Sequence, residues 1–136
     1  MTESTKVDLI PQIERLMVPY GQLALWSLGQ SGFVIKGEST IAYIDPYLSD
    51  AGAKIGAIRR FPIPIDPATI QHANVVFATH EHVDHADADT LGPLMAASPQ
   101  ATLITSPQGR EIALQADIAN ERILVPCVGE RVEFAG

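Results

Sequence analysis

Short apolar runs separated by glycine, proline and aspartate divide the chain into strand-like and helix-like segments. In residues 7–17 the apolar positions recur every three to four residues, which predicts a helix. Three strand-like runs follow at residues 23–29, 32–37 and 39–45. Because only short turns separate these three runs, we expect them to pair as antiparallel strands.

The rest of the chain begins with a long irregular stretch and then alternates strands with helices. Residues 46–73 carry repeated glycine and proline without a clear element, and such a stretch is more often functional than a plain connector. The pattern then predicts a buried strand at 73–80, a helix at 87–97, a strand at 101–106, a helix at 107–117, and two closing strands at 122–127 and 130–136. This alternation after a strand-rich start is typical of a layered α/β domain.

Composition and charge indicate one domain and exclude several classes of partner. With 136 residues, 46% of them hydrophobic and 18% charged, the chain has the balance of a single globular domain over residues 1–136. It has no apolar run of the roughly 20 residues needed to cross a bilayer, and its acidic start does not resemble a signal peptide. We therefore expect a cytoplasmic protein with no membrane partner. A net charge of −7 and scattered basic residues argue against nucleic-acid binding.

Two residues outside the main motif receive plain structural interpretations. Cys127 is the only cysteine, which excludes an intramolecular disulfide and a cysteine-based zinc cluster. It falls at the end of an expected strand, where a lone cysteine is usually a small core residue. His72 stands apart from the other histidines, and we interpret it as a surface residue.

Three of the four histidines crowd into the segment FATHEHVDHAD, at the end of the expected buried strand. His80, His82 and His85, with Asp84, offer imidazole and carboxylate donors, which suit a divalent metal such as zinc, manganese or iron. On a tight loop, His80 and His82 can face one way and Asp84 and His85 another, which favours two adjacent metals over one. Two metals can share a hydroxide nucleophile and polarise the bond that it attacks.

Two other interpretations explain this cluster less well. A solvated polar loop would suit a single histidine, but ligand sites favour the carboxyl end of a buried strand, where these four residues stand. A Ser-His-Asp triad needs a serine in a strained strand-to-helix turn, and the sequence offers none. The metal site is therefore the preferred hypothesis.

The sequence THEHVDH resembles the H-x-H-x-D-H signature of the metallo-β-lactamase-fold hydrolases. Upstream, WSLGQSGFVIKGESTIAYIDPYLSD is similar to the opening strands of that fold, whose third strand ends in Asp-Pro. The amino-terminal helix, the hairpin ALWSLGQSGFVI and the segment IDPATIQHANVVFATHEHVDH together resemble the L-ascorbate-6-phosphate lactonase group. The resemblance covers essentially the whole chain. It implies an α/β fold, the metallo-β-lactamase-like αββα sandwich, of which this chain supplies the first, ββ-rich half.

Carried over by position, the resemblance assigns a role to each residue of the motif. His80 and His82 would hold one zinc or manganese ion, and Asp84 and His85 a second. Asp84 would also orient or deprotonate the bound water, and so be the catalytic residue. Asp45 would brace the histidine loop through hydrogen bonds without binding metal. A plain turn aspartate before proline is an equally good interpretation of Asp45.

The implied activity is hydrolysis of a lactone or ester, in which a metal-bound hydroxide attacks and the metals stabilise the developing oxyanion. The substrate would be a small anionic molecule, a phosphorylated sugar-acid lactone, whose phosphate Arg59 and Arg60 would hold. A solvated basic pair is as good an interpretation of these arginines. Two other functions stay open: a phosphodiesterase of the same fold, similar to phospholipase D, and a non-catalytic metal-binding fragment.

The chain matches only the first half of the sandwich, and it has no histidine after His85. The remaining metal ligands of the family would come from the second half, so we expect a domain that is incomplete at its carboxyl end. Such a half leaves one sheet face apolar and exposed, and one metal position without a protein ligand. We expect it to be inactive alone, to aggregate, or to pair, and a homo-oligomer is one way to cover that face.

Overall fold

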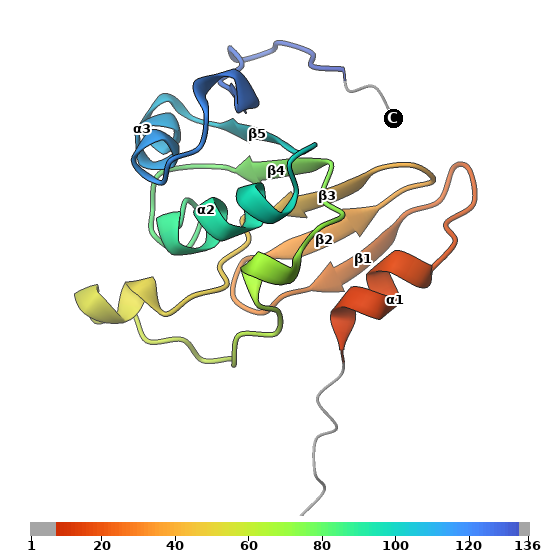
Figure 1. Ribbon diagram of the computed structural model, residues 1–136, viewed down its shortest axis with the longest axis horizontal. Coiled ribbons are helices and arrows are strands. Elements are labelled where there is room, and N and C mark those ends of the chain that lie inside the picture. Colours follow the sequence, from red (N-terminus) through yellow and green to blue (C-terminus); the bar gives the residue numbers. More distant parts are fainter. Residues whose placement is uncertain (1–7, 134–136) are drawn as a thin grey trace, which may run out of the picture.

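The computed structural model describes residues 8–133, in which six strands form one mixed sheet (Figure 1). The strands are β1 (Ala24–Ser27), β2 (Phe33–Lys36), β3 (Ile41–Ile44), β4 (Val75–Ala78), β5 (Thr102–Thr105) and β6 (Ile123–Leu124). The helices are α1 (Leu9–Arg15), α2 (Ala88–Ala97) and α3 (Pro107–Gln115), and the short 3-10 turns are η1 (Ala51–Ile55), η2 (Pro67–Thr69) and η3 (Asn120–Arg122). Within these described residues every expected element is present, at least in part, except the last strand.

The strands lie side by side in the order in which they occur in the chain. β1, β2 and β3 pair antiparallel, as expected, whereas β4, β5 and β6 each pair parallel with the strand before them. Parallel neighbours need a crossover connection, and such crossovers are nearly always right-handed. Because the strand order never reverses, the connection between β3 and β4, helix α2 and helix α3 all cross the same face of the sheet.

The covered face of the sheet carries the hydrophobic core. The register places Val34, Tyr43, Val76 and Leu103 in one row across four neighbouring strands, and all four are fully buried. Fully burying an aliphatic side chain of this size contributes about 1.5–3 kcal/mol. The helices add buried residues to the same cluster: Ile13 of α1, Leu91, Leu94 and Met95 of α2, and Ala113 of α3.

The opposite face of the sheet is apolar and partly open. The register sets Phe33, Ile44 and Phe77 side by side on this face. Ile35 of β2 and Leu25 of the edge strand β1 form the next row on the same face. The side chain of Leu25 is 61% exposed and that of Phe33 is 40% exposed. The expectation of an exposed apolar sheet face is therefore confirmed for the described residues.

The carboxyl end of the described chain differs from the expectation. Of the strand expected at 122–127 only the two-residue β6 forms, and the described part of the final expected strand is not a strand; residues 134–136 lie outside the described residues. Pro126 has no N–H for a strand ladder, and a turn follows it in which the Glu130 N–H donates to the Cys127 carbonyl. Cys127 is consequently exposed, and its interpretation as a core residue was wrong.

His72 is not a surface residue, because it connects helix α1 to the core. Its side chain is only 11% exposed. The Nδ1 of His72 lies 3.2 Å from Oε1 of Glu14, and its Nε2 lies 2.7 Å from the Tyr43 hydroxyl. Burial, and secondly the nearby Glu14 carboxylate, raise the pKa of Tyr43. The interpretation from sequence failed because the connection before β4 crosses the covered face of the sheet, where Tyr43 points.

Candidate active site

The carboxyl ends of β1, β3 and β4 meet at one edge of the sheet. β1 and β3 are both antiparallel to β2, so they run in the same direction, and β4 is parallel to β3. The hairpin turn 29–32, Asp45 and the histidine loop 79–87 are therefore neighbours, in the position where open α/β sheets bind ligands. The Ser31 hydroxyl donates a hydrogen bond to the Asp84 carbonyl oxygen at 3.4 Å and joins the hairpin turn to the histidine loop.

Asp45 holds the start of the histidine loop. Its buried carboxylate accepts hydrogen bonds from the Thr79 N–H at 2.7 Å and from the Thr79 hydroxyl at 2.8 Å. The backbone of Asp45 has a φ of 45°, an uncommon conformation for a residue other than glycine, and its N–H donates to the Phe77 carbonyl at 2.8 Å. Asp45 is thus more than a turn residue before proline, because it ties the end of β3 to the loop after β4.

The contacts of Asp45 reach two histidines and set the position of the proton on His80. The Thr79 hydroxyl gives its one proton to Asp45, so it accepts the Nδ1–H of His80, 3.0 Å away. The Nδ1 of His85 lies 2.8 Å from Oδ2 of Asp45, and the negative carboxylate favours a proton on this nitrogen. The two groups are not aligned as a hydrogen bond, and the buried Nδ1 has no hydrogen-bond partner among the described residues. In His80, Nε2 then carries the free lone pair, which is the form that binds metal, whereas both ring nitrogens of His85 face carboxylates.

The four predicted ligands are gathered in one loop, but they do not converge on one point. The ring centroids of His80 and His82 are 4.6 Å apart, and those of His80 and His85 are 4.0 Å apart. Nε2 of His85 lies 3.6 Å from Oδ2 of Asp84, close to the roughly 3.4 Å expected between two ligands that each lie about 2.1 Å from one ion. The His80 and His85 rings are inclined by only 39°, however, so they pack against each other instead of directing nitrogens to a common centre.

Within residues 8–133, no three His, Cys, Asp or Glu side chains are arranged so that they could hold a metal ion together. The donor types, the lone pair on Nε2 of His80 and the His85–Asp84 distance fit a divalent ion. The side-chain rotamers do not yet fit it, and exposed His82 and partly exposed Asp84 have the freedom to rotate. The assignment of these residues as metal ligands stays a prediction.

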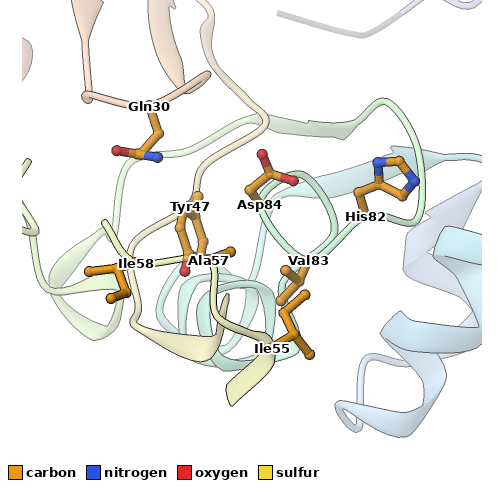
Figure 2. A pocket seen from close by; sticks show the side chains of 8 residues that line it. All are labelled: Gln30, Tyr47, Ile55, Ala57, Ile58, His82, Val83 and Asp84. Carbon is orange, nitrogen blue, oxygen red and sulfur yellow. The ribbon is translucent and has the colours of Figure 1, made fainter. Parts of the chain in front are cut away.

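A cavity of about 370 Å³ opens beside the histidine loop (Figure 2). A volume of this size suits a small organic ligand. In Figure 2 the side chains of Gln30 and Asp84 lie on one side of the cavity, and those of Ile55 and Ile58 lie on the opposite side. The complete lining consists of Gln30, Tyr47, Ile55, Ala57, Ile58, His82, Val83 and Asp84.

Arg59 stabilises the loop before η2 through hydrogen bonds and does not line the cavity. Its Nη1 donates to the carbonyl oxygens of Tyr47 and Ser49, and its Nε donates to the Phe61 carbonyl at 3.1 Å. The guanidinium carbon also lies 4.7 Å from the centroid of the Tyr47 ring, a cation–π contact. Arg60 has an exposed side chain beside this loop. A phosphate-binding role for the two arginines stays a prediction, and the structure shows a loop-bracing role for Arg59.

Gln30 is a cavity residue that the sequence reasoning missed. It lies in the turn of the β1–β2 hairpin with a φ of 51°, and its Oε1 accepts the Arg60 N–H at 3.2 Å. This bond fixes the orientation of the amide, and it leaves the Nε2 donors facing the side of the cavity where Asp84 lies (Figure 2). The only signal in the sequence was the position of Gln30 in the turn Gly-Gln-Ser-Gly.

Asp87 is another residue near the site to which the sequence analysis gave no role. Its buried carboxylate caps α2 by accepting the Asp89 N–H at 3.0 Å, and it also accepts the hydroxyls of Ser49, at 2.6 Å, and of Thr90. The Thr90 hydroxyl oxygen in turn accepts the Leu48 N–H at 2.9 Å. Asp87 therefore ties the loop after β3 to the helix that follows the histidine loop, and its capping motif was the available signal.

A family model described as a beta-lactamase superfamily domain matches residues 24–131, most of the chain. The chain belongs to the beta-lactamase superfamily. A search of curated proteins found no match for it. Membership of the superfamily supports a hydrolase-type function and divalent metal binding in general terms.

The superfamily assignment agrees with the architecture and confirms the expected fold class. The mixed sheet with its three helices on one face corresponds to one α/β half of the expected αββα sandwich. The matched range contains Asp45, the histidine loop and every residue that lines the cavity, whereas helix α1 precedes it. The narrower resemblance to the lactonase group is not supported by this match. None of the helices in residues 8–133 has the length and apolar character that a membrane span requires.

Proposed function

We propose that this member of the beta-lactamase superfamily is a metal-dependent hydrolase that opens a lactone or cleaves a related ester. One observation carries the proposal. Asp45 accepts the proton of the Thr79 hydroxyl, so that His80 donates from Nδ1 and keeps a free lone pair on Nε2. The same histidine loop forms one wall of a ligand-sized cavity through His82 and Asp84.

His80, His82, Asp84 and His85 would hold one or two divalent ions, zinc or manganese by donor type. A bound ion supplies Lewis acidity, which makes water nucleophilic near neutral pH and stabilises negative charge on the attacked oxygen. Asp84 lines the cavity with a half-exposed carboxylate, so it can orient an attacking water and accept its proton. Asp45 keeps His80 and His85 in place without touching the substrate.

Gln30 is the neutral hydrogen-bond donor available to the substrate. Its Nε2 faces the cavity near Asp84, where it can donate a hydrogen bond to the carbonyl oxygen of a lactone. This hydrogen bond becomes stronger as the oxygen becomes negative. The phosphorylated sugar-acid lactone stays the substrate suggested by the sequence resemblance. Because Arg59 is engaged by backbone carbonyls, binding of the phosphate would rest on Arg60.

Two other functions remain to be separated from this one. A phosphodiesterase of the same fold would use the same four residues on a different bond. A non-catalytic metal-binding fragment would use the same donors without turnover. Assays of the purified chain with a panel of lactones and with a generic phosphodiester, beside a measurement of bound zinc and manganese, distinguish the three.

Replacing Asp84 tests the proposed role directly. We expect Asp84→Asn to lower kcat for lactone hydrolysis at least 100-fold and to weaken metal binding, because the amide is a poor metal ligand and a poor base. Thermal unfolding should change little, since the Asp84 carboxylate is partly exposed. Asp50→Asn is the matched control, because Asp50 is exposed and its side chain makes no cap hydrogen bond. Equal activity of the two variants would contradict the proposal.

A further inference from the structure

We propose that Ile55 and Ile58 form an apolar subsite that binds an aliphatic substituent next to the hydrolysed lactone or ester bond. The inference rests on the proposed hydrolase function, and it replaces the phosphorylated substrate suggested by the sequence resemblance with a lactone or ester that carries an alkyl substituent. It concerns the wall of the cavity that faces His82 and Asp84, and it names residues to which the sequence assigned no role.

The cavity has two chemically different sides. Gln30, His82 and Asp84 supply the polar groups, whereas Ile55, Ala57, Ile58 and Val83 supply an apolar surface. In Figure 2, Ile58 lies across the cavity from Asp84, and Ile55 lies next to Val83. A lactone whose carbonyl lies at the polar side would therefore place its ring substituent against the isoleucines.

The two isoleucines are exposed although they belong to an anchored loop. Residue Ile55 is 75% exposed and residue Ile58 is 79% exposed, so neither contributes to the core. Solitary exposed apolar side chains are ordinary, but two such side chains on one wall of a ligand-sized cavity are typical of a binding site.

The apolar wall is held in place by contacts on either side of it. The Tyr47 hydroxyl accepts the Gly52 N–H at 2.9 Å at the start of η1. After the wall, Arg59 binds three backbone carbonyls, and the Arg60 N–H donates to Gln30. Ile55 and Ile58 are thus presented by a braced segment, which lowers the entropy lost when a ligand binds to them.

The charge of the lining also favours an uncharged substituent over a phosphate. Neither lysine nor arginine is among the residues that line the cavity, so no basic side chain of the lining would pair with a phosphate. The guanidinium of Arg59 is turned toward the loop's own carbonyls. An aliphatic group meets no unpaired charge on the isoleucine side, and each buried methylene should improve binding about fourfold.

Binding of lactams tests the subsite without requiring turnover. Unstrained five-membered lactams substituted with methyl, ethyl, propyl and butyl groups resemble the lactones but resist hydrolysis. Isothermal titration of the chain, with and without zinc, gives their affinities. We expect an increase of about fourfold per methylene for the unchanged chain. The increase should fall below twofold in Ile55→Ser/Ile58→Ser and be intermediate in Ile58→Val.

Leu23→Ser is the matched control, because Leu23 is a comparably exposed aliphatic residue that does not line the cavity. It should keep the full dependence on chain length, and circular dichroism should show the same fold for all variants. The same slope in Leu23→Ser and in the isoleucine variants, or no slope in the unchanged chain, would overturn the subsite. Tighter binding of a phosphorylated lactam than of the butyl lactam would overturn it as well.

Hydrolysis of the matching alkyl lactones separates this inference from the proposed function. Turnover that does not depend on chain length would overturn the subsite and leave the hydrolase standing. Binding that improves with chain length, without hydrolysis of any lactone or ester, would support the subsite and refute the hydrolase. Turnover and binding that improve together support both.

Discussion

At the scale of single residues, Arg59 shows how a charged side chain can serve a site without touching its ligand. Three backbone carbonyls and the face of Tyr47 surround its guanidinium, whereas its Nη2 is buried without a hydrogen-bond partner among the described residues. The planar group with five donors can bind several carbonyls of one loop at once, which a lysine ammonium cannot do in the same geometry. Arg59 thereby fixes the segment that carries Ile55 and Ile58.

We predict that Arg59→Ala weakens the binding of phosphorylated and unphosphorylated lactones by the same factor. The variant should also lose roughly 1–3 kcal/mol of unfolding free energy, because three carbonyls lose a charged donor. KM for each substrate and urea denaturation measure the two effects. Arg60→Ala is the control, since its side chain is exposed and its role at the site depends on phosphate alone. A selective loss for the phosphorylated lactone in Arg59→Ala would contradict this prediction.

At the scale of elements, helix α1 depends on contacts with the sheet. Seven residues are too few for a stable isolated helix. Buried Ile13 anchors its apolar side, and the Lys36 ammonium donates to the Ile13 and Glu14 carbonyls at its carboxyl end. The chain of contacts from Glu14 through His72 to Tyr43 joins the same helix to β3 and to the segment before β4.

We predict that Tyr43→Phe changes the response of the fold to alkaline pH. The pKa of Tyr43 is raised above its ordinary value of 10.0 by burial, and secondly by Glu14, so folding favours the protonated phenol. That stabilisation is complete below pH 10 and is lost as the pH rises above 10, where the unfolded chain releases the proton first. Tyr43→Phe should therefore cost about 1 kcal/mol at pH 8, from the lost hydrogen bond to His72, and flatten the alkaline decline.

Urea denaturation at pH 8 and pH 11 measures both effects. Tyr20→Phe is the matched control because Tyr20 is a highly exposed tyrosine. An alkaline decline of equal size in the unchanged chain and in Tyr43→Phe would show that Tyr43 does not cause it.

At the scale of the whole molecule, the order of the strands decides which surfaces are covered. A sheet in which the order of parallel strands reverses receives helices on both faces, whereas this order places every crossover on one face. The other face keeps Leu25 and Phe33 exposed beside Ile44 and Phe77. Contiguous apolar surface of this kind is a common site of association.

We predict that the 136-residue chain associates and binds a hydrophobic dye through this face. Leu25→Thr/Phe33→Thr should reduce the dye fluorescence and shift sedimentation toward the monomer, because threonine keeps the strand propensity while removing apolar surface. Val128→Thr is the control, because Val128 is a fully exposed residue outside the sheet. A monodisperse unchanged chain that does not bind the dye would contradict the prediction, and with it the expected homo-oligomer.

The sequence by itself determined the elements and the position of the candidate site along the chain. Apolar spacing and the turns marked by glycine, proline and aspartate predicted three helices, five of the strands in full and the antiparallel start. Donor type, spacing and the position after a buried strand also singled out His80, His82, Asp84 and His85. These features depend on neighbours within a few residues, so they can be predicted from the sequence without the fold.

Only the tertiary structure decided how distant residues act together. The bonds from Asp45 to Thr79, from Gln30 to Arg60 and from His72 to Glu14 span 34, 30 and 58 positions of the chain. Such pairs depend on strand order and register, which set the positions of side chains from different segments. For that reason the sequence did not reveal the isoleucine wall, the bracing role of Arg59 or the burial of His72. The same residues in another strand order would have had other neighbours.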